Sequence, residues 1–225
     1  MKFKAFLLLF SLIIVVSSGI AQNPSEKTGN WLMYFGMNKL SDKWSIHTEI
    51  QHRNHVIPFD LEQLLLRTGM NYHINKNFMV SGGYAYITGH AYQESNEILS
   101  KEHRIWQQLI IRNKLSRLYF EHRYRYEQRW VDQTFRQRAR YRLMINIPLN
   151  NTKIEKGTVS FHVYDEVFLN IEKGNVFDRN RLYGAFGYQL LDNMGVQVGL
   201  LNQAVTETSK LNLQFGLIFN PDLRK

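Results

Sequence analysis

Charged side chains alternate with uncharged ones through the middle of the chain, in a pattern that could bind anions. Every second residue is charged from Glu121 to Arg129 and again from Arg136 to Arg142. The planar guanidinium group of arginine forms paired hydrogen bonds with carboxylates and phosphates. The pattern therefore predicts a site for small anions. Its candidate residues are Glu121, Arg123, Arg125, Glu127, Arg129, Arg136, Arg138, Arg140, Arg142, Glu166 and Arg181.

A second group of residues could catalyse hydrolysis. Ser160, His162 and Glu166 have the same parity in one segment, so a strand would place them on one face. Same-face neighbours on a strand are separated by about 7 Å, which is too far for a nucleophile-to-base hydrogen bond without help from another strand. The chain also has no Gly-x-Ser-x-Gly motif. We assign no catalytic residue and keep a lipid-acting hydrolase as an alternative.

Metal and cofactor chemistry has little support in the sequence. The chain has no cysteine, which excludes thiol catalysis and cysteine-ligated zinc. His47, His73 and His162 could meet across an enclosed space, but no closely spaced ligand pair accompanies them. We predict no metal site and no cofactor.

The elements that carry these residues are predicted to be strands. In the segment Lys43 to Asn54, apolar and polar side chains alternate with a period of two. The arginines of the block Glu121 to Arg142 also lie on one strand face, whereas a helix would spread them around its whole circumference. A basic nucleic-acid-binding helix is therefore excluded, and we expect no nucleic-acid partner.

Eleven segments alternate in this way, and most have ten or more residues. This length suits a tilted strand crossing a bilayer, which needs about 9 to 11 residues. A mean hydropathy of -0.35 argues against a helical membrane protein. The segments are Asn30 to Asn38, Lys43 to Asn54, Glu62 to Ile74, Asn77 to Thr88, His103 to Lys114, Leu118 to Arg129, Phe135 to Ile147, Thr158 to Asn170, Arg179 to Leu190, Met194 to Gln203 and Lys210 to Phe219.

The first 21 residues have the features of an export signal. Lys2 and Lys4 precede an apolar run from Ala5 to Val16, and Gly19-Ile20-Ala21 is a small-x-small cleavage site. We predict cleavage before Gln22. The mature chain, residues 22–225, is then one domain.

The predicted connections alternate in length, as in outer-membrane barrels. Short turns are expected at Leu40 to Lys43, Asn75 to Asn77, Lys114 to Arg117 and Leu191 to Asn193. Longer loops are expected at Val56 to Asp60, Gly89 to Glu102, Ile171 to Asp178 and Ala204 to Ser209. The segment Pro148 to Gly157 is the exception, because it is long where a short turn is expected.

Folding the hairpin through Val131 to Thr134 pairs Glu127 with Arg138. It also sets Arg125 opposite Arg140 and Arg123 opposite Arg142, and like charges repel. An acidic group from elsewhere in the interior, or a bound anion, must relieve that repulsion.

Several stretches in this order are similar to a bacterial family catalogued as domain of unknown function 2490. They are QLLLRTGMNYHINKNFMVSGGYAY, EHRIWQQL, EHRYRYEQRW, RQRARYRLMINIPL, YDEVFLN and DRNRLYGAFGYQL. The resemblance extends over nearly the whole mature chain. It implies an outer-membrane barrel and brings no assigned reaction or ligand.

We therefore predict an all-β fold, a single up-and-down antiparallel transmembrane β-barrel of 10–12 strands. Bacterial single-chain barrels have even strand numbers. Twelve is favoured over ten because Trp31, Met33, Phe35 and Met37 alternate as a strand does. The alternative fold is a soluble secreted β-protein.

The predicted function is that of a porin-like protein in the outer membrane of a Gram-negative bacterium, in contact with outer-membrane lipid. Its arginine-rich lumen would bind or pass small anions. A purely structural barrel and the lipid-acting hydrolase are the alternatives, and the oligomeric state is left open.

Overall fold

The computed structural model describes residues 23–24, 28–172 and 174–224. The predicted leader, residues 1–21, lies outside the described residues. Within the described residues the chain forms strands and loops without a helix, and thus no helix suited to crossing a membrane. The prediction of an all-β fold is confirmed.

The strands follow one another along the chain, and connections of two to ten residues join β2 to β12. They are β1 (Asn23–Pro24), β2 (Gly29–Lys39), β3 (Trp44–Asn54), β4 (Leu61–His73), β5 (Phe78–Ala91), β6 (Glu94–Leu115), β7 (Leu118–Val131), β8 (Thr134–Pro148), β9 (Val159–Asn170), β10 (Phe177–Leu191), β11 (Met194–Ala204) and β12 (Thr208–Phe219).

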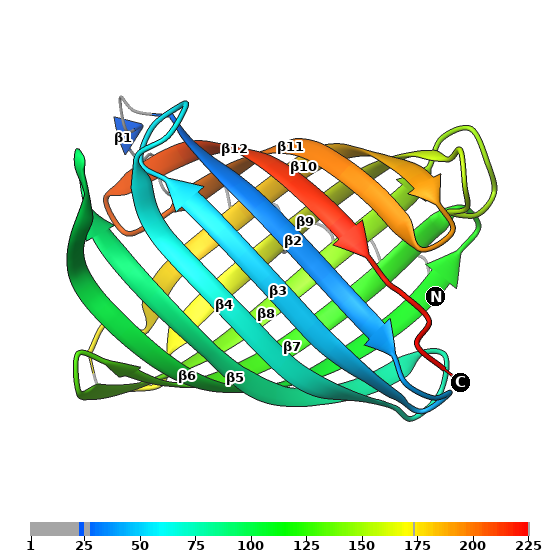
Figure 1. Cartoon of the computed structure of the whole chain (residues 1–225), viewed down its shortest axis with the longest axis horizontal. Helices are drawn as coiled ribbons and strands as arrows, with labels where there is room; N and C mark the ends of the chain where they lie inside the picture. Colours follow the sequence, from blue (N-terminus) through cyan, green and yellow to red (C-terminus); the bar gives the residue numbers. More distant parts are fainter. Residues whose placement is uncertain (1–22, 25–27, 173, 225) are drawn as a thin grey trace, which may run out of the picture.

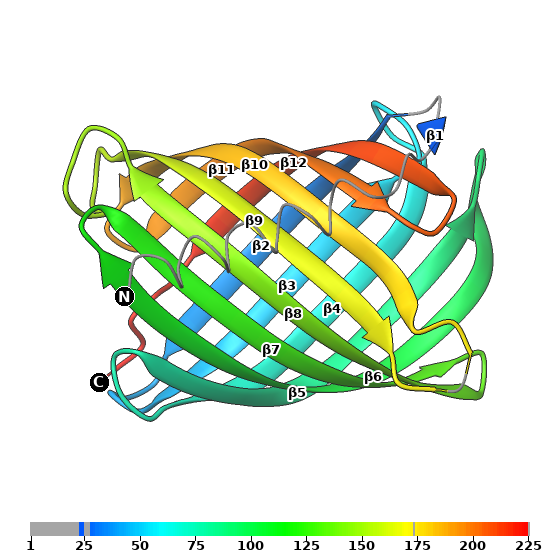
Figure 2. The same ribbon diagram turned by 180° about the vertical axis from the view of Figure 1, so that it is seen from behind.

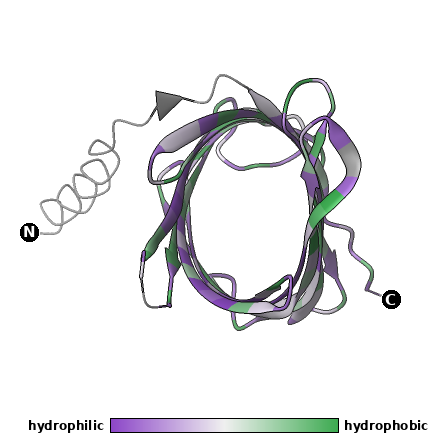
Figure 3. Ribbon diagram, turned by 90° about the vertical axis from the view of Figure 1, so that its left-hand side faces the viewer, coloured by the Kyte–Doolittle hydropathy of each residue, from purple (hydrophilic) through white to green (hydrophobic). Residues whose placement is uncertain are grey.

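The strands β2 to β12 form a closed barrel (Figures 1 and 2). Each pairs with the next in antiparallel orientation, and β12 pairs with β2 in parallel to close the wall. Viewed from one end, the ribbons form a ring around an interior (Figure 3). Strand β1 adds two residues beside β12 and takes no part in the closure.

The barrel closes with eleven strands, within the predicted range but one fewer than the favoured twelve. The expectation of twelve rests on the rule that bacterial single-chain barrels have even strand numbers, which holds when every neighbouring pair is antiparallel. The parallel pairing of β12 with β2, which sets Leu213 beside Asn30, permits an odd number. The ten-strand alternative is wrong, because Gly29–Lys39 is part of the sheet.

The connections lie at two rims of the barrel. The C-terminal rim carries residues 40–43, 74–77, 116–117, 149–158 and 192–193 and the end of β12. The N-terminal rim carries residues 55–60, 92–93, 132–133, 171–172, 174–176 and 205–207 and the start of β2. Because the strand number is odd, β2 begins at one rim and β12 ends at the other.

The predicted alternation of loop lengths is only partly present. The segment from Gly89 to Glu102, predicted as a loop, is mainly strand, because β5 extends to Ala91 and β6 starts at Glu94. A two-residue turn also joins β7 to β8, where Asp132 and Gln133 have positive φ angles of 46° and 71°. This is the type I′ geometry that suits the twist of a hairpin. The ten-residue connection 149–158 is long, as expected.

The chain segment after β12 is attached to the C-terminal rim. The backbone amide of Lys39 donates to the carbonyl of Pro221, and the amide of Leu223 donates to the carbonyl of Lys39. Arg224 binds Asp42 at 2.7 Å and Asp222 at 2.6 Å. Its hydrogen bonds to Asp222 hold the pKa of that exposed carboxyl at about 2.

Alternation along each strand separates a polar interior from an apolar exterior. Large apolar side chains such as Ile50, Leu66 and Phe186 are exposed on the outer surface. Charged and amide side chains such as Glu49 and Gln214 are buried inside. The core of this molecule is therefore its polar lumen.

Candidate functional site

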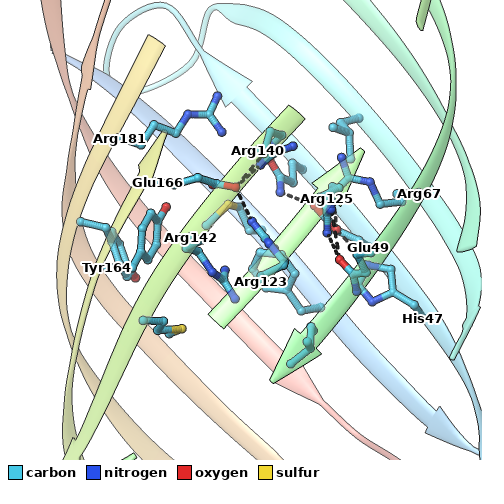
Figure 4. A pocket seen from close by; sticks show the side chains of 18 of the residues that line it. His47, Glu49, Arg67, Arg123, Arg125, Arg140, Arg142, Tyr164, Glu166 and Arg181 are labelled. Carbon is cyan, nitrogen blue, oxygen red and sulfur yellow. Dashed lines mark hydrogen bonds and ion pairs between the residues drawn. The ribbon is translucent and has the colours of Figure 1, made fainter. Parts of the chain in front are cut away.

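The lumen contains a cavity of about 390 Å³ whose wall is rich in arginine (Figure 4). Twelve arginines line it, and they come from six of the strands. They are Arg53, Arg67, Arg104, Arg112, Arg123, Arg125, Arg129, Arg138, Arg140, Arg142, Arg179 and Arg181.

Nearly all the residues predicted to bind anions lie together at this cavity. Nine of the eleven line it, namely Glu121, Arg123, Arg125, Arg129, Arg138, Arg140, Arg142, Glu166 and Arg181. Glu127 is completely buried among them, with 0% of its surface exposed. Arg136 is different, because it is exposed close to the N-terminal rim and does not line the cavity. It has the same parity as Arg138 and Arg140, but its place near the start of β8 puts it outside the enclosed part of the lumen.

Glu127 is the centre of an ion-pair network. Its carboxylate contacts Arg138 at 2.6 Å, Arg140 at 2.6 Å and Arg104 at 3.3 Å. These three arginines come from β8 and β6, on the two sides of β7. One carboxylate thus holds three strands together from the inside.

The pairing of β7 with β8 matches the register predicted from the hairpin. Glu127 faces Arg138, Arg125 faces Arg140, and Arg123 faces Arg142. The acidic group that must relieve the two repulsive pairs is Glu166 of β9. Its carboxylate binds Arg123 at 2.7 Å and Arg140 at 2.8 Å (Figure 4).

Two further carboxylates of the network were not predicted. Glu102 binds Arg104 at 2.6 Å and Arg129 at 2.8 Å. It was missed because its segment was taken for a loop. Asp178 binds Arg138 at 2.7 Å. The sequence assigns it to the loop Ile171 to Asp178, whereas β10 starts at Phe177 and its register against β9 shifts between Phe177 and Arg179.

Positive charge still exceeds negative charge in the lumen. Among the described residues, six carboxylates lie within 4.0 Å of the twelve arginines, those of Glu49, Glu102, Glu121, Glu127, Glu166 and Asp178. Arginine keeps its charge under all ordinary conditions. The cavity wall is therefore cationic even after its ion pairs are counted.

Three buried arginines are held by glutamine oxygens. Arg53 donates to Gln51 at 2.9 Å and to Gln63 at 2.6 Å. Arg125 donates to Gln108 at 3.1 and 2.7 Å, and Arg181 donates to Gln203 at 2.9 Å.

These glutamine contacts orient the guanidinium groups without neutralising them. Within the described part of the chain, neither Arg53 nor Arg181 has a carboxylate within 4.0 Å. For Arg125, the Glu127 carboxylate lies at that limit, 4.0 Å away. Oriented but uncompensated guanidinium groups are suited to receiving an anion.

Trp31 joins two of these arginines. The guanidinium carbon of Arg53 lies 4.0 Å from the centre of a Trp31 ring, and that of Arg181 lies 4.9 Å away. The indole is 4% exposed, and its ring nitrogen has no hydrogen-bond partner among the described residues. The sequence predicts a strand at Trp31 but does not indicate that Trp31 faces the lumen, because the inner face of β2 is apolar from Trp31 to Met37.

The three histidines of the proposed polar face lie apart from one another. His47 binds Glu49 at 2.9 Å, His73 binds Ser45 at 2.9 Å, and His162 binds Ser160 at 2.8 Å. The described residues contain no group of three or more histidine, cysteine or acidic side chains suited to hold a metal ion.

The prediction that Ser160 and His162 are too far apart for a hydrogen bond is wrong. The two side chains lean together, and Oγ lies 2.8 Å from Nε2 although the residues are two positions apart. The backbone spacing of about 7 Å is therefore bridged by the length of the imidazole. On its other side, Nδ1 of His162 lies 2.6 Å from Oδ1 of Asn146 on β8.

The fold and its interior define a class of protein, a closed eleven-stranded β-barrel with a cationic and extensively ion-paired lumen. Residues 28–214 match the family described as "Protein of unknown function (DUF2490)", and the chain belongs to that family. This confirms the resemblance seen in the sequence.

Two further comparisons add no assigned activity. An uncharacterized protein of Methylorubrum extorquens is 26% identical over 226 residues, covering 95% of each chain. No solved structure matches the chain.

Proposed function

We propose that this protein is an outer-membrane β-barrel whose lumen binds small anions. In this proposal residues 1–21 direct export and are removed, and the exterior of the barrel contacts outer-membrane lipid. The observation that carries the anion-binding part is the set of buried arginines held by glutamine. The observation that supports the membrane part is the apolar exterior.

The apolar exterior of the barrel supports the membrane part of the proposal. Ile50 on β3, Ile105 on β6, Tyr124 on β7 and Phe186 on β10 are 42–62% exposed on the outer wall, and these strands lie on different sides of the barrel. Soluble monomers rarely expose continuous apolar surface of more than a few hundred Å². An outward apolar band is the feature by which barrels contact hydrocarbon.

Aromatic side chains near the C-terminal rim fit the same proposal. Trp44 and Tyr72 pack at 4.8 Å between ring centres, at the ends of β3 and β4 next to that rim. Phe78 and Tyr188 are also exposed near that rim. Membrane barrels place such girdles where the hydrocarbon meets the headgroups.

The membrane part of the proposal is tested by fractionation and gel migration. We expect the expressed protein in the membrane pellet, with the band before boiling migrating differently from the band after boiling. Recovery in the soluble periplasmic fraction would contradict this part and favour a soluble β-protein.

The anion-binding part follows from the cost of uncompensated charge. A buried charge that lacks its partner destabilises a protein by about 3–5 kcal/mol. Arg53 and Arg181 have no carboxylate partner among the described residues, so an anion between them would offset part of that cost. Their guanidinium groups suit a carboxylate or a phosphate, both of which accept paired hydrogen bonds.

Binding is tested by calorimetric titration of the detergent-solubilised full-length protein with inorganic phosphate. We expect the wild type to bind phosphate and the Arg53→Gln/Arg181→Gln variant to lose binding. Arg136→Gln removes one exposed charge near the rim and should bind as the wild type does. A wild type that binds no phosphate, or three proteins that bind equally, would favour a purely structural barrel.

Transport is a separate question from binding. Side chains largely fill the interior of small barrels, so we expect any conductance in planar bilayers to be slight. An anion-selective current that loses its selectivity in the double variant would extend the proposal from binding to passage.

A further inference from the structure

Two serine–histidine pairs lie on the inner wall near the C-terminal rim. In one, Ser160 Oγ is 2.8 Å from His162 Nε2 on β9. In the other, Ser45 Oγ on β3 is 2.9 Å from His73 Nε2 on β4. Both pairs have the separation needed for proton transfer from a serine to an imidazole.

A third residue completes the first pair. His162 Nδ1 lies 2.6 Å from the amide oxygen of Asn146. An amide oxygen only accepts hydrogen bonds, so Nδ1 carries the proton and Nε2 is left to accept the proton of Ser160. This is the tautomer that a general base requires.

The second pair lacks this arrangement. The Nδ1 atom of His73 has no hydrogen-bond partner among the described residues, and Asn71 donates to Ser45 Oγ at 3.0 Å instead. Nothing in the described wall fixes the tautomer of His73. The chain thus contains its own matched control for the first pair.

Gly187 of β10 provides the space that the first pair occupies. It faces Ser160 in the register. A Cβ atom at this position would lie 2.6 Å from His162 Nε2 and 3.0 Å from Ser160 Oγ. A side chain here would push into the serine–histidine hydrogen bond.

The group is next to the lumen cavity. Met144 pairs with Tyr164 and both line the cavity, and the next inward pair toward the C-terminal rim is Asn146 with His162. Ser160 and His162 are 3% and 5% exposed. Met144 is therefore the inward neighbour of Asn146 on the cavity side, and access from the cavity to the pair requires a rotation of its unbranched, flexible side chain.

We propose that Ser160, His162 and Asn146 form an acyl-transfer site that hydrolyses a small carboxylic ester of an anionic compound. The catalytic residues are Ser160 as nucleophile and His162 as general base, and Asn146 is a positioning residue. The activity goes beyond anion binding. Only the preference for an anionic ester rests on the function proposed above.

The reaction needs only the ester and water. Ser160 Oγ attacks the carbonyl carbon while its proton passes to His162 Nε2, and a tetrahedral adduct forms. The ester C–O bond then breaks, and His162 returns the proton to the departing alcohol. Water then attacks the acyl carbon while its proton passes to His162 Nε2. The bond from that carbon to Ser160 Oγ breaks, His162 returns the proton to Oγ, and the carboxylic acid leaves.

A fluorophosphonate probe tests the nucleophile in the detergent-solubilised full-length protein. We expect labelling that peptide mass spectrometry assigns to Ser160 and that falls about a hundredfold or more in Ser160→Ala and His162→Ala, the scale of general-base catalysis. Ser45→Ala removes the serine of the incomplete pair and should label as the wild type does. Absence of labelling in the wild type, or labelling that survives Ser160→Ala, overturns the proposal.

Two substitutions separate catalysis from folding. Asn146→Asp keeps an acceptor for Nδ1 and should retain labelling, whereas Asn146→Ala should lose it while the shift in gel migration on boiling is unchanged. Gly187→Ala should also lose labelling, because the new methyl group enters the hydrogen bond. Equal labelling of the two Asn146 variants would contradict the positioning role.

Two model esters separate this proposal from the anion-binding one. Phenyl acetate is neutral, and 4-acetoxybenzoate carries a carboxylate that cannot reach its own ester. We expect Ser160-dependent hydrolysis of both, with the anionic ester favoured at least tenfold in kcat/KM. Serine-dependent hydrolysis without that preference would support the site of Ser160, His162 and Asn146. It would contradict the proposal that the cationic lumen binds anions. If neither ester is hydrolysed in a Ser160-dependent way, the proposed acyl-transfer site is contradicted, whatever the result of the phosphate titration.

Discussion

Glu127 on β7 and Arg140 on β8 form a 2.6 Å ion pair although they are not opposite each other in the register. The residue opposite Glu127 is Arg138, which it also binds. A single carboxylate therefore serves both a direct and a diagonal arginine. This sharing, together with the contacts of Glu166 with Arg140 and of Glu121 with Arg142, offsets the repulsion among the buried and half-buried arginines of β8.

We expect Glu127→Gln to destabilise the barrel strongly. The substitution leaves Arg104, Arg138 and Arg140 without their common counter-charge in a completely buried position. Removing one partner of a buried ion pair costs about 3–5 kcal/mol. The measurement is the free energy of unfolding in urea, in detergent micelles.

Glu155→Gln is the control for this substitution. Glu155 is exposed in the loop between β8 and β9, so the same change in charge should alter the free energy of unfolding little. Equal effects of the two substitutions would contradict the central role of Glu127.

We expect Gln203→Glu to weaken phosphate binding. The substitution keeps the shape of the partner of Arg181 and gives it a negative charge at the position of the 2.9 Å hydrogen bond. The carboxylate neutralises the guanidinium, which then attracts an added anion less. The loss should be of the size of one hydrogen bond to a charged group, about 1.5–3 kcal/mol. Affinity in the calorimetric titration should therefore fall about tenfold to a hundredfold.

A glutamine outside the lumen gives the matched comparison. Gln133 lies in the exposed turn between β7 and β8, and Gln133→Glu adds the same charge there. Phosphate affinity that drops equally in both variants would point to a general effect of net charge.

The sequence predicts the strands and the charged face well, because both follow from a period of two. The residues Arg123, Arg125, Arg138, Arg140 and Glu166 lie in the lumen for this reason. Parallel closure of the barrel could not be predicted. It depends on which strands pair across the two ends of the chain, and the alternation within each strand carries no information about that pairing.

Other features were missed because they depend on side-chain reach and on irregular backbone. The contact of His162 with Asn146 joins two strands and needs both the register and the rotamers. The glutamine partners of Arg53, Arg125 and Arg181 carry no charge, so a search for charged residues passes over them.

We expect Gly83→Ala to disrupt packing around Trp106. A Cβ atom at Gly83 would lie 2.1 Å from the carbonyl oxygen of Thr68 and 2.7 Å from Cζ2 of the completely buried Trp106. Overpacking of this kind costs about 1–3 kcal/mol. The free energy of unfolding and the emission maximum of the indole should both change.

The neighbouring glycine is the control. At Gly82 the nearest atom to an added Cβ is the carbonyl oxygen of Trp106 at 3.7 Å, an ordinary contact. Gly82→Ala should therefore fold as stably as the wild type. Equal free energies of unfolding for the two alanine variants would contradict the claim that Gly83 is required by the close approach of β4, β5 and Trp106.

We expect Phe186→Arg to be costly in a bilayer and Phe59→Arg to be harmless. Phe186 is 62% exposed on the outer wall near the middle of β10, and Phe59 is 69% exposed in the loop 55–60 at the N-terminal rim. An arginine facing the centre of a bilayer destabilises a barrel by about 2–4 kcal/mol, and the cost falls toward zero near the interface. The measurement is the free energy of unfolding in lipid vesicles. Because both phenylalanines are similarly exposed, a surface in water would tolerate both substitutions, and an equally small cost for the two would contradict the membrane proposal.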